Sequence, residues 1–73
     1  MKNTFDIFNS LDLDLELFYA IRFNKGEVFL QGHYNANLVS KSKQEDYKFI
    51  IDESGFVCGE KIIGNVIIKI ILT

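Results

Sequence analysis

The sequence has no proline and no tryptophan, and it has only one cysteine and one histidine. Cys58 therefore has no partner in the chain for a disulfide, and one thiol with one imidazole is too few protein ligands for a structural zinc site. We expect neither a metal nor another cofactor. A lone cysteine is typical of a reducing compartment, so the sequence favours a cytoplasmic protein.

Long hydrophobic runs and a strong excess of one charge are also missing. The longest apolar stretch, near the C-terminus, is interrupted by Lys69 and is too short to span a bilayer as a helix. The first residues lack the apolar run of a signal peptide. Because the net charge is only −2, we expect no membrane partner and regard nucleic acid as a disfavoured one.

The chain is too short to enclose both a core and a deep pocket. Its 73 residues, 48% of them hydrophobic, predict a single small domain over 1–73. Ligand pockets usually need several hundred Å³. His33 has no serine or cysteine nucleophile beside it, and Cys58 follows apolar neighbours. The sequence therefore predicts a protein that is not an enzyme.

The feature that is present is alternation. From Leu11 to Phe23 one parity is hydrophobic throughout, while the other is mostly polar and carries three carboxylates. A period of two predicts a β-strand with one buried and one wet face. A two-residue turn at Lys25-Gly26 would join it to a second strand, pairing Phe23 with Val28 and, further along, Tyr19 with Gly32.

The remainder of the chain predicts more strands. Residues 36–45 either continue the second strand or form a crossover, and we favour the crossover, as a short helix capped by Asn35 or Asn37 or as an irregular segment. A third strand is expected over Tyr47–Asp52, with Tyr47, Phe49 and Ile51 inward. A fourth over Phe56–Ile62 and a fifth over Val66–Leu72 would be joined by a Gly64-Asn65 turn that sets Glu60 opposite Lys69.

The predicted fold is thus mainly β (α+β): a four- to five-stranded, largely antiparallel sheet built from local hairpins, with one or two short helices. The fifth strand is apolar on both faces, since Ile67 and Ile71 flank Lys69 on the second face. Such a strand is normally central or covered twice. The cover could be the N-terminal segment Phe5–Phe8, a second copy of the chain, or a partner. Within residues 4–10 that segment could extend the strand through Phe5 and Ile7, but we favour a short helix with Phe5 and Phe8 on one stripe. Ile67, Lys69 and Ile71 are therefore candidate contacts of a homodimer or of a partner.

Three carboxylates, Asp12, Asp14 and Glu16, form the clearest candidate binding site. They would lie in a row on one strand face and could imitate a line of phosphates for a basic partner. The alternatives are an ordinary solvated face, which the residue types favour, and a metal site. A metal site is disfavoured because carboxylates so spaced converge poorly on one ion.

These observations lead to one preferred functional hypothesis and two others. The preferred one is stoichiometric binding to another protein, by a compact acidic chain that serves a phage or mobile element as an inhibitor of a host protein, including a nucleic-acid-handling one. The second is a structural subunit that assembles with itself. The third, a nucleic-acid-binding module, would use the lysines around Lys43.

Overall fold

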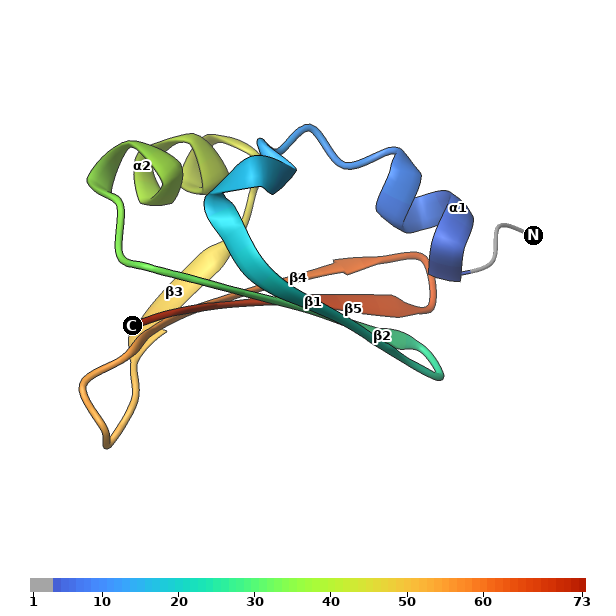
Figure 1. Ribbon diagram of the computed structural model, residues 1–73. Coiled ribbons are helices and arrows are strands. Elements are labelled where there is room, and N and C mark those ends of the chain that lie inside the picture. The colour runs from blue at the N-terminus through green and yellow to red at the C-terminus, as the bar shows by residue number, and fades with distance from the viewer. Residues whose placement is uncertain (1–3) are drawn as a thin grey trace.

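The computed structural model describes residues 4–73 and contains one five-stranded mixed sheet in the order β1-β2-β5-β4-β3. Two short helices lie on one face of this sheet, and no element within residues 4–73 covers the other face (Figure 1). The predicted α+β class is confirmed. The elements are α1 (Thr4–Asn9), the short 3-10 helix η1 (Leu15–Leu17), β1 (Phe18–Asn24), β2 (Glu27–Gly32), α2 (Ala36–Gln44), β3 (Lys48–Ile51), β4 (Val57–Ile63) and β5 (Val66–Leu72).

The first hairpin, β1 with β2, has the predicted turn. Phe23 pairs with Val28 across a two-residue connection, Lys25-Gly26. Gly26 has φ 74°, in the left-handed region that glycine enters without steric cost. The register therefore follows from the turn, as expected for an antiparallel hairpin.

Beyond a bulge in β1, the predicted register is wrong. Phe18 rather than Tyr19 pairs with Gly32, because the register shifts between Phe18 and Ala20. The chain passes so close to Gly32 that a Cβ there would lie 2.7 Å from the Leu17 carbonyl oxygen and 3.2 Å from the Phe18 ring. Glycine at this position is what allows the bulged strand to approach.

The strand predicted to begin at Leu11 begins only at Phe18, so that part of the prediction is wrong. β2 ends at Gly32, and residues 11–17 consequently have no strand beside them to pair with. The alternation of residues 11–16 nevertheless predicts correctly which side chains are buried. Leu11, Leu13 and Leu15 are half-buried against the core, whereas the three residues between and after them are exposed.

The ambiguous segment 36–45 forms the helix α2, one of the two kinds of crossover that we favoured over a longer second strand. Asn35 caps α2, since its side-chain oxygen accepts a hydrogen bond from the N–H of Leu38 at 3.1 Å. Leu38 is 4% exposed and fixes the helix to the core. α2 carries the chain from β2, next to one edge of the sheet, to β3 at the opposite edge (Figure 1).

β5 lies at the centre of the sheet, as its apolar pattern predicted. It pairs antiparallel with β4 across the predicted Gly64-Asn65 turn, and Glu60 lies opposite Lys69. On its other side it pairs parallel with β2, with Leu30 opposite Ile70. Local hairpins do not predict this parallel pair, because it joins segments separated by α2 and two strands.

The core fills the space between the sheet and the helix layer. Ile7 of α1 belongs to it, with the inward side chains of β2 and β5. The N-terminal segment thus packs on the same face as α2 and leaves Ile67 and Ile71 uncovered. The possibility that this segment covers the second face of β5 is therefore wrong. The buried hydrophobic residues are Ile7, Phe18, Val28, Leu30, Leu38, Tyr47, Val66, Ile68, Ile70 and Leu72.

β3 and β4 differ from prediction at their ends. β3 begins at Lys48 and β4 runs over Val57–Ile63, each within a residue or so of the predicted bounds. Tyr47 is buried and Phe49 half-buried, as expected. Ile51, expected to point inward, is 73% exposed because β3 is an edge strand and neither helix reaches its end.

Candidate protein interface

The three predicted carboxylates lie on the helix side of the molecule, in and beside η1 rather than on a strand face. All of them are exposed. Asp12 lies 3.7 Å from the Lys41 amine, with both side chains at least half exposed, so the pair contributes little to stability. Asp14 caps η1, because its Oδ1 accepts a hydrogen bond from the N–H of Glu16 at 3.1 Å. We refer to Asp12, Asp14 and Glu16 as the acidic segment.

A cluster of exposed aromatic rings lies on the same side. Phe23 of β1 contacts both phenylalanines of α1, with ring centroids 6.1 Å from Phe5 and 5.0 Å from Phe8. Phe5 is 58% and Phe23 45% exposed, and the neighbouring Ile21 is 37% exposed. We refer to Phe5, Phe8, Ile21 and Phe23 as the aromatic patch.

The aromatic patch exists because α1 is too short to cover the edge of the sheet. α1 has six residues and buries Ile7 over the core, while β1 is an edge strand. Ile21 and Phe23 therefore point to the helix side without a complete cover. The sequence pattern predicted Phe5 and Phe8 on one helix stripe, but their contact with Phe23 could not be predicted because it depends on where α1 packs.

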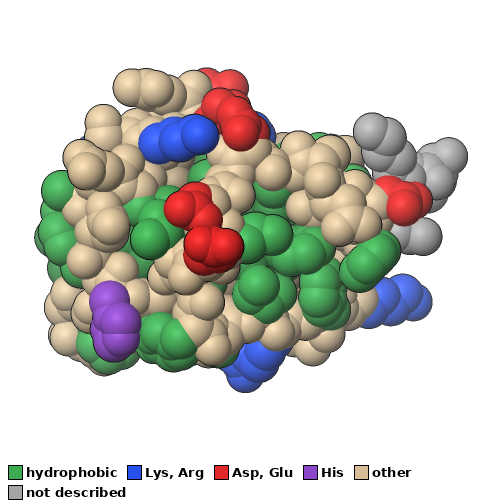
Figure 2. Space-filling model, turned by 45° about the horizontal axis from the view of Figure 1, so that its top comes forward, with side chains coloured by type: hydrophobic (Ala, Val, Ile, Leu, Met, Phe, Trp, Pro, Cys, Tyr) green, Lys and Arg blue, Asp and Glu red, His purple; other side chains and the backbone are tan. Residues whose placement is uncertain are grey.

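The aromatic patch and carboxylates share one side of the molecule. Figure 2 shows hydrophobic side chains gathered on one side of the molecule, with acidic side chains at the margins of that gathering. The sequence also brings acidic and apolar side chains together, since Glu16 lies between Leu15 and Leu17, two partly exposed leucines that lead into β1. An apolar centre with a charged margin is the usual composition of a protein interface.

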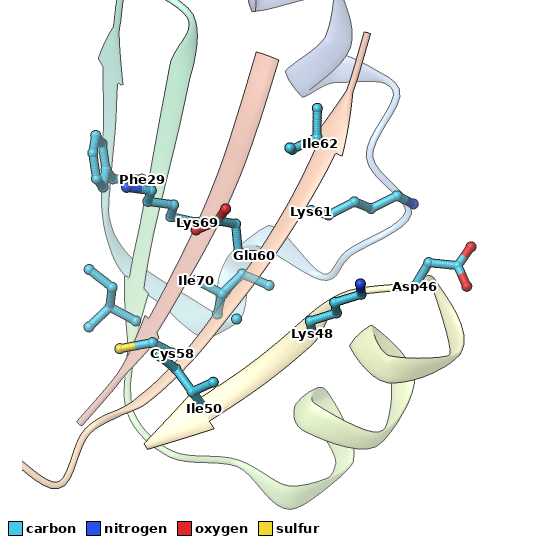
Figure 3. Close-up of a pocket in the computed structure, with 12 residues that line it drawn as sticks. Phe29, Asp46, Lys48, Ile50, Cys58, Glu60, Lys61, Ile62, Lys69 and Ile70 are labelled. Atoms are coloured by element: carbon cyan, nitrogen blue, oxygen red, sulfur yellow. The ribbon is translucent and has the colours of Figure 1, made fainter. Parts of the chain in front are cut away.

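The second candidate surface is the sheet face without helices, which we call the open face. It carries Ile67, Lys69 and Ile71 of β5, all half-buried. Ile50 and Ile62, on β3 and β4, are 69% and 64% exposed. A groove of about 750 Å³ crosses this side of the sheet, and its lining includes Cys58 and Phe29 (Figure 3).

A row of mostly charged side chains crosses the open face from edge to edge. In the strand pairings Arg22 is opposite Phe29, Phe29 opposite Lys69, Lys69 opposite Glu60, and Glu60 opposite Lys48. Figure 3 shows four of these residues in succession across the strands. The Phe29 ring lies between two cations, with Arg22 at 5.4 Å and Lys69 at 5.5 Å from its centroid.

Lys69 has its ion pair with Glu27, at 3.5 Å, although its cross-strand neighbour is Glu60. Within residues 4–73, Glu60 has no ion pair closer than 4.0 Å. The predicted neighbours are therefore present in the sheet, but the salt bridge forms with the residue at the start of β2. Glu60 therefore lies between Lys48 and Lys69 in the strand pairings without an ion pair of its own within residues 4–73.

Cys58 lies on the open face, and its thiol is less acidic than that of an ordinary cysteine. Burial, and then the charge of Asp52 together with its hydrogen bond, raise the pKa of the Cys58 thiol. The Sγ lies 3.6 Å from Asp52 Oδ2. His33 is exposed, and the neighbour of its ring is Tyr19, with the two ring centroids 5.1 Å apart. Cys58 and His33 thus form no nucleophile and base pair, since each has a different neighbour.

Metal ligands are not gathered anywhere in the described chain: residues 4–73 contain no group of three or more His, Cys, Asp or Glu side chains placed to hold an ion. No helix in the same range is long and apolar enough to cross a membrane.

Two buried hydroxyl groups, on Ser42 and Tyr47, have no hydrogen-bond partner among the described residues. Tyr47 is 4% exposed, and its ring lies under the Lys61 amine at 5.5 Å. Burial, and to a lesser degree the charge of Glu45, raise the pKa of Tyr47 to about 12. Tyr47 is therefore a core residue, as the inward parity of the third strand predicted.

Comparison of the chain with models of known protein families, with curated protein sequences and with solved structures found no significant match.

Proposed function

We propose that this protein acts by binding another protein stoichiometrically, without catalysis, through the aromatic patch and the acidic segment. The observation that supports this most is the exposure of the patch: Phe5 and Phe23 hold ring contact with each other while each keeps about half of its side chain in solvent. Burying such a side chain is favourable by about 1.5–3 kcal/mol. Exposed apolar patches with a polar margin commonly mark binding sites for proteins.

The partner's chemistry follows from the margin of the patch. Exposed carboxylates on the acidic segment favour a partner surface that carries lysine and arginine around an apolar centre. Basic surfaces of this kind occur where proteins bind the phosphates of nucleic acids. We therefore propose a nucleic-acid-handling protein as the partner, and an inhibitory role in which this small chain occupies the partner's basic surface on behalf of a phage or mobile element.

The test is affinity capture from the native host with three forms of the protein. The first variant replaces the acidic segment by amides (Asp12→Asn, Asp14→Asn, Glu16→Gln). Asparagine still caps η1, so the fold is retained. The second variant, Phe5→Gln, changes a side chain that is 58% exposed. We expect both to lose the partner that the unmodified protein retains, and the amide variant's residual binding to respond less to salt.

The matched control is Glu53→Gln, which removes one exposed carboxylate from the β3–β4 turn, on a different element. It should capture the partner as the unmodified protein does. Capture that both interface variants retain in full would refute the proposed surface. A purified partner that is chemically converted in the presence of this chain would refute the non-catalytic role.

A further inference from the structure

We infer that the open face is the interface of a symmetric homodimer, in which two copies pack sheet against sheet. This inference concerns the face opposite the aromatic patch and does not depend on the proposed partner. The open face holds five large apolar side chains that the helices do not cover: Phe29, Ile50, Ile62, Ile67 and Ile71. The occupant we commit to is a second copy, because the residue pattern of the face is complementary to itself.

The complementarity follows from the register. Face-to-face packing of two identical sheets requires a two-fold axis in the plane between them. With that axis along the strands and between β4 and β5, each β4 residue faces the β5 residue of the other copy that is its own cross-strand neighbour. Glu60 then faces Lys69, and Ile62 faces Ile67. The charge of Glu60, which has no ion pair within its own described chain, gains one in the dimer.

The strands one step further out agree with this arrangement. The same axis sets β3 over β2 of the other copy, so that Lys48 faces Phe29 in a geometry suited to a cation–π contact. Cys58 faces Ile71, and both are half-buried. Ile50 faces Gln31 of the other copy, a contact that involves no charge. Packed sheets lie about 10 Å apart, so the ends of these side chains meet between the two copies.

Other axes give worse contacts. An axis over β5 sets Lys69 against Lys69 of the other copy, and an axis across the strands along the charged row does the same for both Lys69 and Glu60. An axis between β2 and β5 sets Glu60 against Arg22, but it also sets Ile62 against Asn24 and Ile67 against the Glu27 carboxylate. It leaves β3, with the exposed Ile50, without an opposing strand. Like charges in contact are costly, and so are apolar side chains set against polar ones or left in solvent, so the axis between β4 and β5 is favoured.

The experiment measures molar mass by light scattering over a wide dilution series of the whole chain. We expect a concentration-dependent change from the 8.4 kDa of one chain to twice that mass. Glu60→Lys and Lys69→Glu should each raise the dimer dissociation constant by about thirtyfold or more, because each sets like charges face to face. The double variant restores opposite charges and should recover most of the affinity.

Two further variants keep the test decisive. Ile62→Lys changes a side chain that is 64% exposed in the single chain, so folding tolerates it, but it should abolish the dimer. Glu53→Lys makes the same charge change as Glu60→Lys in the β3–β4 turn and should leave the dimer intact. A mass of 8.4 kDa at every concentration, or a dimer that survives Ile62→Lys, would overturn the inference. Either result would leave the partner test on the helix side unaffected.

Cys58 provides a second readout without any substitution. In the dimer its thiol is covered by the other copy, so its reaction with Ellman's reagent should slow as protein concentration rises. The slowing should be absent in Ile62→Lys. A reaction rate that stays constant while the mass doubles would place the contact elsewhere and refute this interface.

Discussion

Among single residues, Tyr47 combines deep burial with an unpaired hydroxyl group. Its ring contributes to the core, but the hydroxyl has no acceptor or donor among the described residues. An unpaired buried polar group costs about 1–3 kcal/mol. The ring therefore stabilises the fold, whereas the hydroxyl group opposes it.

We accordingly predict that Tyr47→Phe leaves the free energy of unfolding unchanged or raises it by up to about 2 kcal/mol near neutral pH. Denaturant titration of both proteins measures the difference. Tyr34→Phe, at a position 56% exposed, is the matched control and should have no effect. A loss of more than 1 kcal/mol (roughly the value of one hydrogen bond) would mean that the hydroxyl group has a partner in solution.

Tyr47 also predicts how stability depends on pH. Its pKa is about 12 in the fold against an ordinary 10, so folding favours the neutral phenol. The stability that this preference contributes is fully present below pH 10, where the Tyr47 phenol is neutral in the unfolded chain as well. It is lost as the pH rises from 10 to 12. We expect the unmodified protein to lose stability over this range and Tyr47→Phe to lose less, as measured by denaturant titration at several pH values. Equal losses in the two proteins would assign the alkaline effect to other groups.

Of the elements, α2 offers the sharpest test of the local signals. Both Asn35 and Asn37 could cap it from the sequence, and the structure assigns the role to Asn35. Asn35→Ala should lower the free energy of unfolding by about 1 kcal/mol. Asn37→Ala, on the exposed first turn of the helix, is the control and should be neutral or slightly stabilising. Denaturant midpoints compare the two, and the reverse order would contradict the assignment.

The elements that the sequence predicted are those whose signals are local. Two hairpin turns and the α2 cap each depend on residues within a few positions of one another. The alternation from Leu11 correctly identified which side chains are buried but not the strand, since a strand also needs a neighbour and β2 ends at Gly32. The candidate site was predicted in part for the same reason: the acidic residues adjoin in sequence, whereas Phe23 meets Phe5 only through tertiary packing.

The ion pairs formed within residues 4–73 contribute little to the stability of the complete domain. The two ion pairs within residues 4–73 join side chains that are each at least one third exposed. We predict that added sodium chloride changes the free energy of unfolding of dilute protein by less than about 0.5 kcal/mol. Denaturant titration at low and moderate salt checks this. A large change would mean that a loss of partner capture at high salt reports unfolding rather than the interface.

The central place of β5 determines when the molecule can form during synthesis. β5 leaves the ribosome after every other strand, yet it alone joins the β1–β2 hairpin to the β3–β4 hairpin. Until it emerges, the nascent chain is two small half-sheets with unpaired edges and bare aliphatic surfaces, the kind of intermediate that aggregates or recruits chaperones. Translation and folding are therefore coupled here through one late segment, and a ribosome stalled before residue 66 would hold two hairpins in place of a domain.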